Sequence, residues 1–401
     1  MRTAAGWAVR RLIPEAEPSA VLPFVMRWGR TRVKALLRRR GLLRGTALVC
    51  PQAGRMWAIG QDLVRPVAGE VLVSVEVSAV SPGTERAHFK RLPNARPPFP
   101  YFPGYSAAGV VLEAGRGTGL EPGARVALVA PHASLAVARA VQVYPVPADV
   151  SLEEAAFVQL GVIALQAVQR ADLQLGTRVV VVGQGLVGQI LAQLAAAVGA
   201  DVVASVARSD RRATTPLRRV VKQLITLERD SAGLAGLQAE VTFEATGAPD
   251  GVATALVCTG VGGRIVLAGS TRGTTRRFDF GALADRAITV VGAHISSVSP
   301  SARTSLARAF LDLLSRRRLD VAPLISERIH PLEAERFYRR LAASDDGVVG
   351  AVFCWDRLVP GERACRVWLV TPPDLTPFRG GRMARWPLGW RARRQESGDS
   401  A

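Results

Sequence analysis

Three glycines with the spacing G-x-G-x-x-G stand between a buried strand and a helix, a position from which they could hold a phosphate. Gly183, Gly185 and Gly188 follow four consecutive valines at 179–182, which are typical of a strand buried on both faces of a parallel sheet. Apolar residues then recur every three or four positions, which predicts a helix. In such a loop the first glycine permits a tight turn, the second lets the backbone approach a pyrophosphate, and the third lets the helix pack closely. The sequence therefore predicts a dinucleotide-binding site.

The residues that end the next strand bear on which dinucleotide is bound. An acidic residue about 20 positions after the glycines would bind the ribose hydroxyls and favour NAD. Ser205 or Val206 occupies that position here. Arg208 and Arg211 follow, and the planar guanidinium group matches the oxygens of a 2′-phosphate. We therefore expect NADP(H) to be preferred, while Asp210 leaves NAD as the alternative if the strand runs further.

The elements around this loop indicate an α/β fold with a doubly wound parallel sheet. Strands are predicted at 240–247, ending in a turn, at 262–269, entered by a glycine turn, and at 287–293, and helical segments alternate with them. Residues at the ends of these strands join the loop as candidates for binding the cofactor. The complete set of cofactor-binding candidates is Gly183, Gly185, Leu186, Val187, Gly188, Val206, Arg208, Arg211, Thr246, Gly247 and Gly269.

The preceding part of the chain contains many short strands. Residues 70–77 alternate between polar and apolar side chains, and glycine and proline turns recur from about residue 46 to residue 143. This pattern predicts a small β-barrel-like domain. Residues 78–86 are predicted to form a polar turn, and the proline-rich residues 92–103 a loop.

Both ends of the chain are strongly basic. The formal net charge is +19, and the N-terminal extension, residues 1–44, holds 11 basic and 2 acidic residues. Its apolar positions predict an amphipathic helix that either packs on the rest of the chain or lies on an anionic membrane. Only three of the 52 basic residues are lysine, so the charge reflects arginine bias and nucleic-acid binding is disfavoured. Residues 357–401 lack periodicity and are predicted to be a poorly ordered basic tail.

Composition gives little sign of export or of a membrane span. The sequence has no run of 18 apolar residues and no signal-peptide pattern. Its four cysteines are widely spaced, without a C-x-x-C motif. We therefore expect a cytoplasmic protein without a disulfide framework.

Seven segments, in this order, resemble the medium-chain dehydrogenase/reductase superfamily of zinc-type alcohol dehydrogenases and their zinc-free relatives. They are residues 70–73, 81–86, 103–109, 122–126, 183–188, 243–247 and 262–267. The motif S-x-G-T-E-R followed by P-G-Y is similar to bacteriochlorophyllide-type dehydrogenases and to the dehydrogenase half of two-domain oxidoreductases. The resemblance implies a GroES-like catalytic domain formed by residues 45–150 and 296–356, a Rossmann domain at 151–295, and a homodimer.

The zinc ligands of that superfamily are replaced in this sequence. The first ligand position holds Pro82, the second holds Tyr105, and the third falls near Leu160. None of these side chains belongs to the set of nitrogen, sulfur and carboxylate ligands that zinc requires. We therefore expect neither a catalytic nor a structural zinc.

Without a metal, hydroxyl donors would have to stabilise the charge that develops on a carbonyl oxygen. Thr84 matches the superfamily position that relays the alcohol proton, and Tyr105 offers a second hydroxyl. Glu85 or His88 could connect such a relay to solvent, although Glu85 could instead pair with an arginine. We expect an NAD(P)H-dependent oxidoreductase that transfers hydride between nicotinamide and a carbonyl, an alcohol or an activated C=C group of a small molecule. The alternatives are an NAD-dependent alcohol or sugar dehydrogenase and a non-catalytic dinucleotide-binding scaffold.

Overall fold

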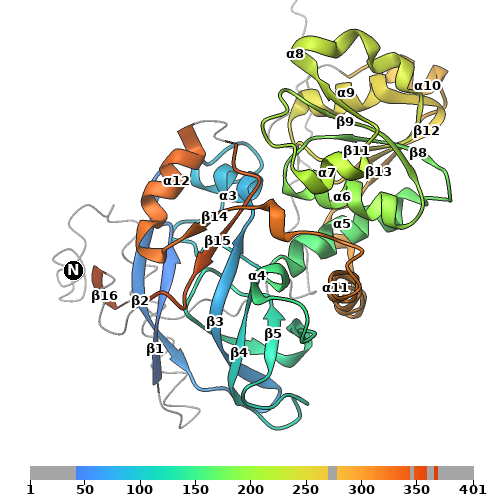
Figure 1. The fold of residues 1–401 in the computed structure, drawn as a ribbon. Coiled ribbons are helices and arrows are strands. Elements are labelled where there is room, and N and C mark those ends of the chain that lie inside the picture. Colours follow the sequence, from blue (N-terminus) through green and yellow to red (C-terminus); the bar gives the residue numbers. More distant parts are fainter. Residues whose placement is uncertain (1–41, 270–277, 344–346, 359–364, 369–401) are drawn as a thin grey trace, which may run out of the picture.

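Two regions with different sheets lie side by side in the computed structural model (Figure 1). The structure describes residues 42–269, 278–343, 347–358 and 365–368. One region is rich in antiparallel strands and contains both early and late parts of the chain. The other is formed by the middle of the chain and contains a parallel sheet flanked by helices.

The parallel sheet has six strands in the order β10-β9-β8-β11-β12-β13. These strands are β8 (Arg178–Val182), β9 (Asp201–Ala207), β10 (Gln223–Thr226), β11 (Ala239–Glu244), β12 (Thr259–Leu267) and β13 (Thr289–Gly292). From β8 the chain moves outward to β10, and from β11 it moves outward in the other direction. The strand order therefore reverses between β8 and β11, which confirms the doubly wound arrangement. In such sheets ligands bind beyond the carboxyl ends of the strands at this point.

Helices cover both faces of this sheet, and the valines of β8 point alternately toward them. Val179 and Val181 belong to a core shared with α5 and α6, whereas Val180 and Val182 belong to a second core with residues of α9. All four side chains are buried, as predicted for a strand covered on both faces. The helices of this region are α5 (Val158–Ala171), α6 (Leu186–Ala197), α7 (Thr215–Val220), α8 (Leu227–Asp230), η2 (Ser231–Leu237), α9 (Pro249–Cys258), α10 (Phe280–Asp285), η3 (Ile295–Ser297) and α11 (Pro300–Ser315).

The second region is built around the long strand β3 (Glu70–Val80). It forms a seven-stranded sheet in the order β14-β15-β3-β4-β5-β7, with β6 also paired to β3. The other strands of this sheet are β4 (Ala107–Ala114), β5 (Arg125–Leu128), β6 (Leu135–Arg139), β7 (Val143–Pro145), β14 (Ile325–Ile329) and β15 (Gly350–Cys354). Because β15 returns to pair with β3, late residues complete a sheet begun by early ones. The short helices of this region are α3 (Pro82–Phe89), η1 (Ala140–Gln142), α4 (Leu152–Ala155), η4 (Ala322–Leu324), η5 (Pro331–Glu333) and α12 (Ala334–Ala343).

The ends of the described chain correct two boundaries predicted from the sequence. Strand β1 (Leu42–Val49) begins inside the expected extension at 1–44, because it pairs along its whole length with β2 (Trp57–Val64). In the expected tail at 357–401, β16 (Cys365–Trp368) adds to the same small sheet beside β2. The predicted amphipathic helix of the extension lies outside the described residues.

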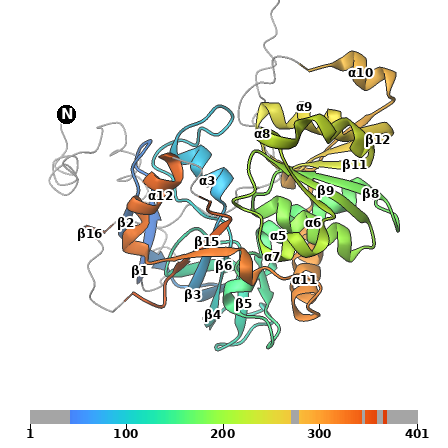
Figure 2. The same ribbon diagram turned by 45° about the horizontal axis from the view of Figure 1, so that its top comes forward.

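A continuous apolar core joins the two regions. Val77 and Ala79 of β3 lie in one buried cluster with Phe157 and Val158 at the start of α5. Helix α11 packs against α5 below the parallel sheet (Figure 2). Within the described part of the chain, no helix combines the length and the apolar character needed to cross a membrane.

Candidate active site and dinucleotide site

The glycine loop connects β8 to α6 as predicted, and its geometry leaves room for a phosphate. Gly183 has a φ of +113°, which favours glycine, and its N–H donates to the carbonyl of Val206 at 2.7 Å. A Cβ on Gly188 would lie 1.9 Å from the carbonyl oxygen of Gly183, so glycine is what lets α6 approach β8. A Cβ on Gly185 would meet no atom within 4 Å. The space in front of the unpaired N–H groups of the first turn of α6 is therefore open.

Cofactor-binding candidates from three strands meet at this edge of the sheet. Thr246 and Gly247 follow β11, and Gly269 follows β12. A Cβ on Gly183 would lie 3.0 Å from the nitrogen of Thr246, and a Cβ on Gly269 would lie 2.5 Å from the nitrogen of Gly247. The loop after β8 and the turns after β11 and β12 are thus in contact, as expected where the strand order reverses.

Two loop residues predicted to bind the cofactor differ in exposure. Leu186 is buried, and a Cβ on Gly350 of the β-rich region would lie 3.3 Å from its Cδ1 atom. Val187 is only partly buried and packs at the margin of the same core. The side chain of Leu186 therefore helps join the two regions, and only its backbone can face a phosphate.

Glu244, which the sequence did not single out, organises the carboxyl edge. Its Oε1 atom accepts hydrogen bonds from the N–H groups of Thr246 (2.7 Å) and Gly247 (3.2 Å) and from the Thr246 hydroxyl. The side chain is fully buried, and within the described residues its Oε2 atom has no hydrogen-bond partner. Burial raises the pKa of this carboxyl, although the hydrogen bonds from Thr246 and Gly247 act in the opposite direction.

The raised pKa of Glu244 predicts a pH-dependent contribution to stability. A group with a raised folded-state pKa binds its proton more tightly in the native than in the unfolded protein. Relative to Glu244→Gln, the wild type should therefore be most stable below the ordinary pKa of 4.5 and should lose that advantage as the pH rises through the folded-state value. Urea unfolding of both proteins from about pH 4 to about pH 8 measures the difference. A difference that stays constant over this range would contradict the prediction.

The residues expected to determine the preference for NADP or NAD lie in different environments around the end of β9. Val206 is fully buried in the strand, so it reaches the site only through its backbone bond to Gly183. Arg208 and Arg211 lie beyond the strand and are exposed. The carboxylate of Asp210 pairs with Arg229 of α8 at 3.5 Å. The acidic group that could favour NAD is therefore paired with a cation, and the two arginines are exposed just beyond the end of β9.

In the β-rich region, the segment predicted as a polar turn forms a helix from residue 82 onward. Pro82 occupies the first turn of α3, where its missing N–H costs no intrahelical bond. Ser81 precedes the helix, and Glu85 reaches back so that its Oε1 atom accepts the N–H of Ser81 at 2.8 Å. Thr84 is partly exposed, does not cap the helix, and its hydroxyl has no hydrogen-bond partner in the described residues. This hydroxyl is therefore available to a ligand.

Glu85 is the centre of a buried polar network and does not connect to solvent. Its Oε2 atom lies 3.0 Å from Nε2 of His132 and accepts a hydrogen bond from the hydroxyl of Tyr338 on α12. The side chains of Glu85 and His132 are 2% and 0% exposed. Burial, and then the charge of Glu85, raise the pKa of Tyr338 well above its ordinary value, so this tyrosine is a neutral donor. Its partners are thus a histidine and a tyrosine, not the arginine that the sequence suggested, and its own side chain is buried.

The same network continues from His132 to the last strand. His132 Nδ1 lies 2.8 Å from the hydroxyl of Ser78, which accepts a hydrogen bond from the indole N–H of Trp355 at 2.8 Å. Gly104 adopts a φ of +86° and lies so close to His132 that a Cβ there would be 2.7 Å from the ring. The network therefore supports the turn that carries the partly buried Tyr105, in addition to the start of α3.

His88, the other relay candidate, lies on α3 with Glu85 and contacts an aromatic residue. It packs edge-to-face on Tyr101 with 5.6 Å between the ring centroids. The Tyr101 hydroxyl is buried, and burial raises its pKa above the ordinary value. His88 is thus an aromatic contact of the proline-rich loop.

The three positions expected to hold zinc ligands carry no metal-binding side chain. Pro82 and Tyr105 lie in the segments just described, and Leu160 is 1% exposed within the apolar core of α5. Among the described residues there is also no group of three or more histidine, cysteine or acidic side chains arranged to hold a metal ion.

His132 and Tyr338 were missed because no local pattern marks them. They lie 47 and 253 residues from Glu85. His132 comes from the segment between β5 and β6, and β6 pairs with β3, whereas Tyr338 comes from α12, which packs against α3. A buried glutamate in a polar segment was the one available signal, because such a group requires hydrogen-bond partners. The sequence did not indicate where those partners come from.

Comparison with known proteins agrees with this geometry. Residues 187–315 match the family model described as zinc-binding dehydrogenase. The 2-desacetyl-2-hydroxyethyl bacteriochlorophyllide A dehydrogenase of Cereibacter sphaeroides is 29% identical over an alignment of 228 positions, which covers 52% of this chain and 68% of that protein. Sorbitol dehydrogenase of Mus musculus is 31% identical over an alignment of 134 positions, which covers 31% of this chain and 38% of that protein.

Solved structures share the two-region fold. A candidate zinc-binding dehydrogenase from Sinorhizobium meliloti 1021, solved bound to NADP, has a TM-score of 0.67 at 20% identity. The match covers 78% of this chain and 99% of that one. It identifies the β-rich region as GroES-like and the parallel sheet as Rossmann-like.

These comparisons place the chain in the zinc-type medium-chain dehydrogenase/reductase superfamily. Its named relatives are dehydrogenases, and the chain is accordingly assigned to the NAD(P)-dependent oxidoreductases of that superfamily. The relative from Cereibacter sphaeroides is a bacteriochlorophyllide dehydrogenase, which is the subgroup that the S-x-G-T-E-R motif resembles.

Proposed function

We propose that the chain is a zinc-independent oxidoreductase that prefers NADP(H) and acts on a carbonyl, an alcohol or an activated C=C group of a small molecule. The observation that carries the proposal is the open glycine loop beside two exposed arginines. A Cβ on Gly185 would meet no atom within 4 Å, Arg208 and Arg211 are exposed just after β9, and Asp210 pairs with Arg229. An arginine fork suits a 2′-phosphate, whereas the ribose hydroxyls of NAD would need a free carboxylate.

The residues of the site fit a nicotinamide dinucleotide. Buried atoms without a partner in the described residues, Ser205 Oγ and Gln184 Oε1, lie near the carboxyl ends of β9 and β8. The glycine loop and the turns at Thr246 and Gly269 would hold the pyrophosphate and the nicotinamide half. When bound, the cofactor supplies or accepts the hydride. The chain then contributes orientation, exclusion of water and hydrogen-bond donors.

Zinc independence rests on the chemistry of the side chains at the expected ligand positions. Proline and leucine offer no ligand atom, and tyrosine lies outside the usual ligand set. The family-model match covers residues 187–315 and therefore none of these three positions. The hydroxyl groups of Thr84 and Tyr105 would instead donate to the oxygen on which charge develops. The Glu85 network would act as their support, because it fixes both the start of α3 and the turn at Gly104.

We infer the domain division from the two sheets. The bounds expected from the sequence are residues 45–150 and 296–356 for the catalytic domain and residues 151–295 for the nucleotide domain. Two helices move across these bounds: α4 packs on β3, β4 and β5 and goes with the catalytic domain, and α11 packs on α5 and goes with the nucleotide domain. Strands β14 and β15 support this division, since they return to the sheet around β3. A homodimer and membrane contact through the N-terminal extension stay predictions, and so does a cytoplasmic location.

The proposal is tested on the purified full-length protein. We expect metal analysis to find zinc well below one equivalent, and fluorescence titration to give a dissociation constant for NADPH at least about tenfold below that for NADH. A panel of aldehydes, ketones, sugars and enones, followed by NADPH absorbance, should reveal turnover. Thr84→Val should lower kcat without changing NADPH affinity. Thr84→Ser, which keeps the hydroxyl group, should retain the wild-type kcat.

Three results would overturn parts of the proposal. Stoichiometric zinc would remove the metal-free mechanism. Tighter binding of NADH would favour the NAD-dependent alcohol or sugar dehydrogenase. Tight cofactor binding without turnover on any of these substrates would favour the non-catalytic scaffold.

A further inference from the structure

The loop that carries the exposed arginines is held by one buried side chain. Residues 208–214 link β9 to α7, and Gln189 lies against them from the first part of α6. The Nε2 atom of Gln189 donates to the carbonyl of Arg212 at 2.7 Å. Its Oε1 atom accepts from the hydroxyl of Thr214 at 2.5 Å and from the N–H of Thr214 at 3.3 Å. Gln189 is 0% exposed, so water does not compete for these bonds.

Gln189 also reaches the glycine loop. Its Nε2 atom donates a second hydrogen bond, to the carbonyl of Gln184 at 3.0 Å. An amide side chain offers two donor hydrogens and two acceptor lone pairs, and Gln189 uses all of them. One side chain therefore ties three segments together: the loop at Gln184, helix α6, and the segment from Arg208 to Thr214.

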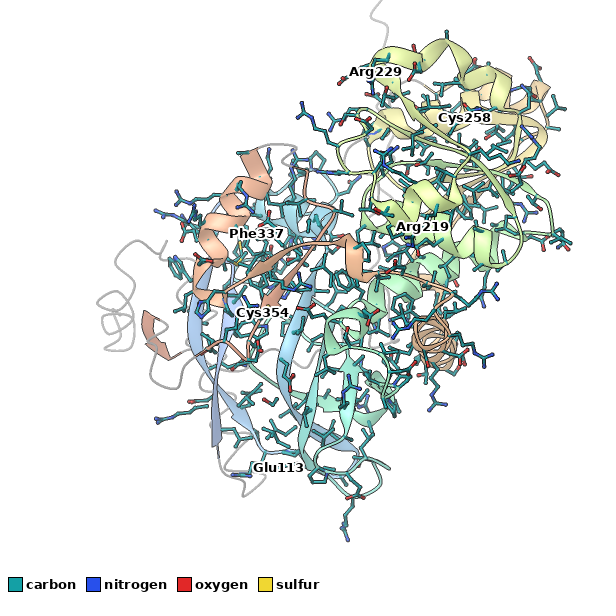
Figure 3. The ribbon with its side chains drawn as sticks, viewed as in Figure 1. Glu113, Arg219, Arg229, Cys258, Phe337 and Cys354 are labelled. Atoms are coloured by element: carbon teal, nitrogen blue, oxygen red, sulfur yellow. The ribbon has the colours of Figure 1, made fainter. Side chains whose placement is uncertain are left out.

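The opposite side of residues 208–214 has a weaker attachment. The N–H of Ala213 donates to the carbonyl of Asp210 at 2.9 Å, and the Asp210 carboxylate pairs with Arg229. Arg229, labelled on α8 in Figure 3, also donates to the hydroxyl of Thr226 at 3.0 Å. The side chains of Arg229 and Asp210 are 66% and 48% exposed, and such surface pairs contribute little. Gln189 thus supplies buried hydrogen bonds to residues 208–214, whereas the Asp210–Arg229 pair is exposed.

We propose that Gln189 is the positioning residue that sets the preference for NADP(H) over NAD(H). It touches neither cofactor nor substrate. It holds residues 208–214 against the glycine loop, so that the arginines face the position of a 2′-phosphate while the pyrophosphate is held a few residues away. If residues 208–214 are held less firmly, the contact between the arginines and the 2′-phosphate of NADP(H) weakens. The contacts that NADP(H) and NAD(H) have in common are unchanged. The inference rests on the proposed function, because it assigns the arginines to the 2′-phosphate.

Helix α6 offers a matched control for this inference. Gln193 lies one turn further along, is 5% exposed, and also uses its amide on backbone groups. Its Nε2 atom donates to the carbonyl of Asp320 at 3.1 Å, and its Oε1 atom accepts the N–H of Asp320 at 2.8 Å. Its loss should cost a similar amount of stability without reaching residues 208–214.

The test compares Gln189→Met and Gln193→Met, which keep side-chain length and remove the amide. Dissociation constants for NADPH and NADH are measured by fluorescence titration on the full chain. We expect Gln189→Met to raise the NADPH constant about tenfold and the NADH constant less than about threefold, a loss of the order expected for a buried hydrogen-bonding group. Gln193→Met should leave the ratio of the two constants at the wild-type value.

The outcomes separate this inference from the proposed function. The wild-type ratio alone tests the proposed preference for NADP(H). An equal change in both constants in Gln189→Met, or the same ratio shift in Gln193→Met, would overturn the inference whatever the wild-type ratio is. If Gln189→Met does not fold, Thr214→Val removes only the hydroxyl that bonds to Gln189 Oε1, and the same shift in ratio is expected with smaller size.

Discussion

Gly185→Ala should bind NADPH about 100-fold more weakly than the wild type while unfolding at the same urea concentration. Gly185 has φ −74° and ψ 177°, which alanine adopts without strain. A Cβ there would meet no protein atom within 4 Å. The added methyl group therefore occupies only the space in which the pyrophosphate would approach the backbone. A 100-fold loss corresponds to about 2.7 kcal/mol of binding free energy.

Two other glycine-to-alanine variants serve as controls for Gly185→Ala. Gly188→Ala places a Cβ 1.9 Å from the carbonyl oxygen of Gly183, so both stability and NADPH affinity should fall. Gly233→Ala meets no atom within 4 Å and lies outside the loop, so neither should change. Affinity is measured by fluorescence titration and stability by urea unfolding. Wild-type affinity in Gly185→Ala would refute the assignment of the pyrophosphate to this loop.

Glu85→Ala should destabilise the protein by about 3–5 kcal/mol, the range expected when one member of a buried ion pair is removed. The carboxylate accepts bonds from His132, Tyr338 and the N–H of Ser81, and all three donors would lose their partner inside the core. Glu85→Gln keeps one carbonyl oxygen, which can accept either from Ser81 or from His132 and Tyr338, so its cost should be smaller than that of Glu85→Ala. Urea unfolding of the three proteins measures these differences.

A surface glutamate provides the control for Glu85. Glu327 pairs with Arg340, and the two side chains are 31% and 45% exposed. Glu327→Ala should cost about 1 kcal/mol or less, because solvent screens such pairs. A loss in Glu85→Ala no larger than that in Glu327→Ala would mean that the buried network contributes little to stability. It would then also be a poor candidate for holding Thr84 and Tyr105 in place.

Local sequence was sufficient for the parallel sheet and its glycine loop. Four valines in succession are typical of a strand covered on both faces, and all four are buried here. Gly183 and Gly188 are required by a positive φ and by the close approach of α6 to the end of β8, which both depend on neighbouring residues. The replacement of the zinc ligands was equally readable, since it depends only on which residues stand at three positions. Resemblance added the order of the segments and the return of the chain to the first domain.

The partners of Glu85 and Asp210 could not be predicted from the local sequence. Each is an acidic residue in a polar segment, and its function depends on a partner from a distant element. Glu85 meets His132 because β6 pairs with β3, and it meets Tyr338 because the late helix α12 packs against α3. Asp210 meets Arg229 only because α8 follows β10, which lies beside β9.

The sequence alone determined the class of this protein: a dinucleotide-binding oxidoreductase whose expected metal ligands are replaced. Such features are local, because turn geometry, strand burial and ligand chemistry depend on a few adjacent residues. The tertiary structure decided which acidic groups are neutralised, which hydroxyl stands open, and that Gln189 fixes the arginine-bearing loop. Those properties come from contacts between elements far apart in the chain, which burial and hydrogen-bond satisfaction select only once the sheets have formed.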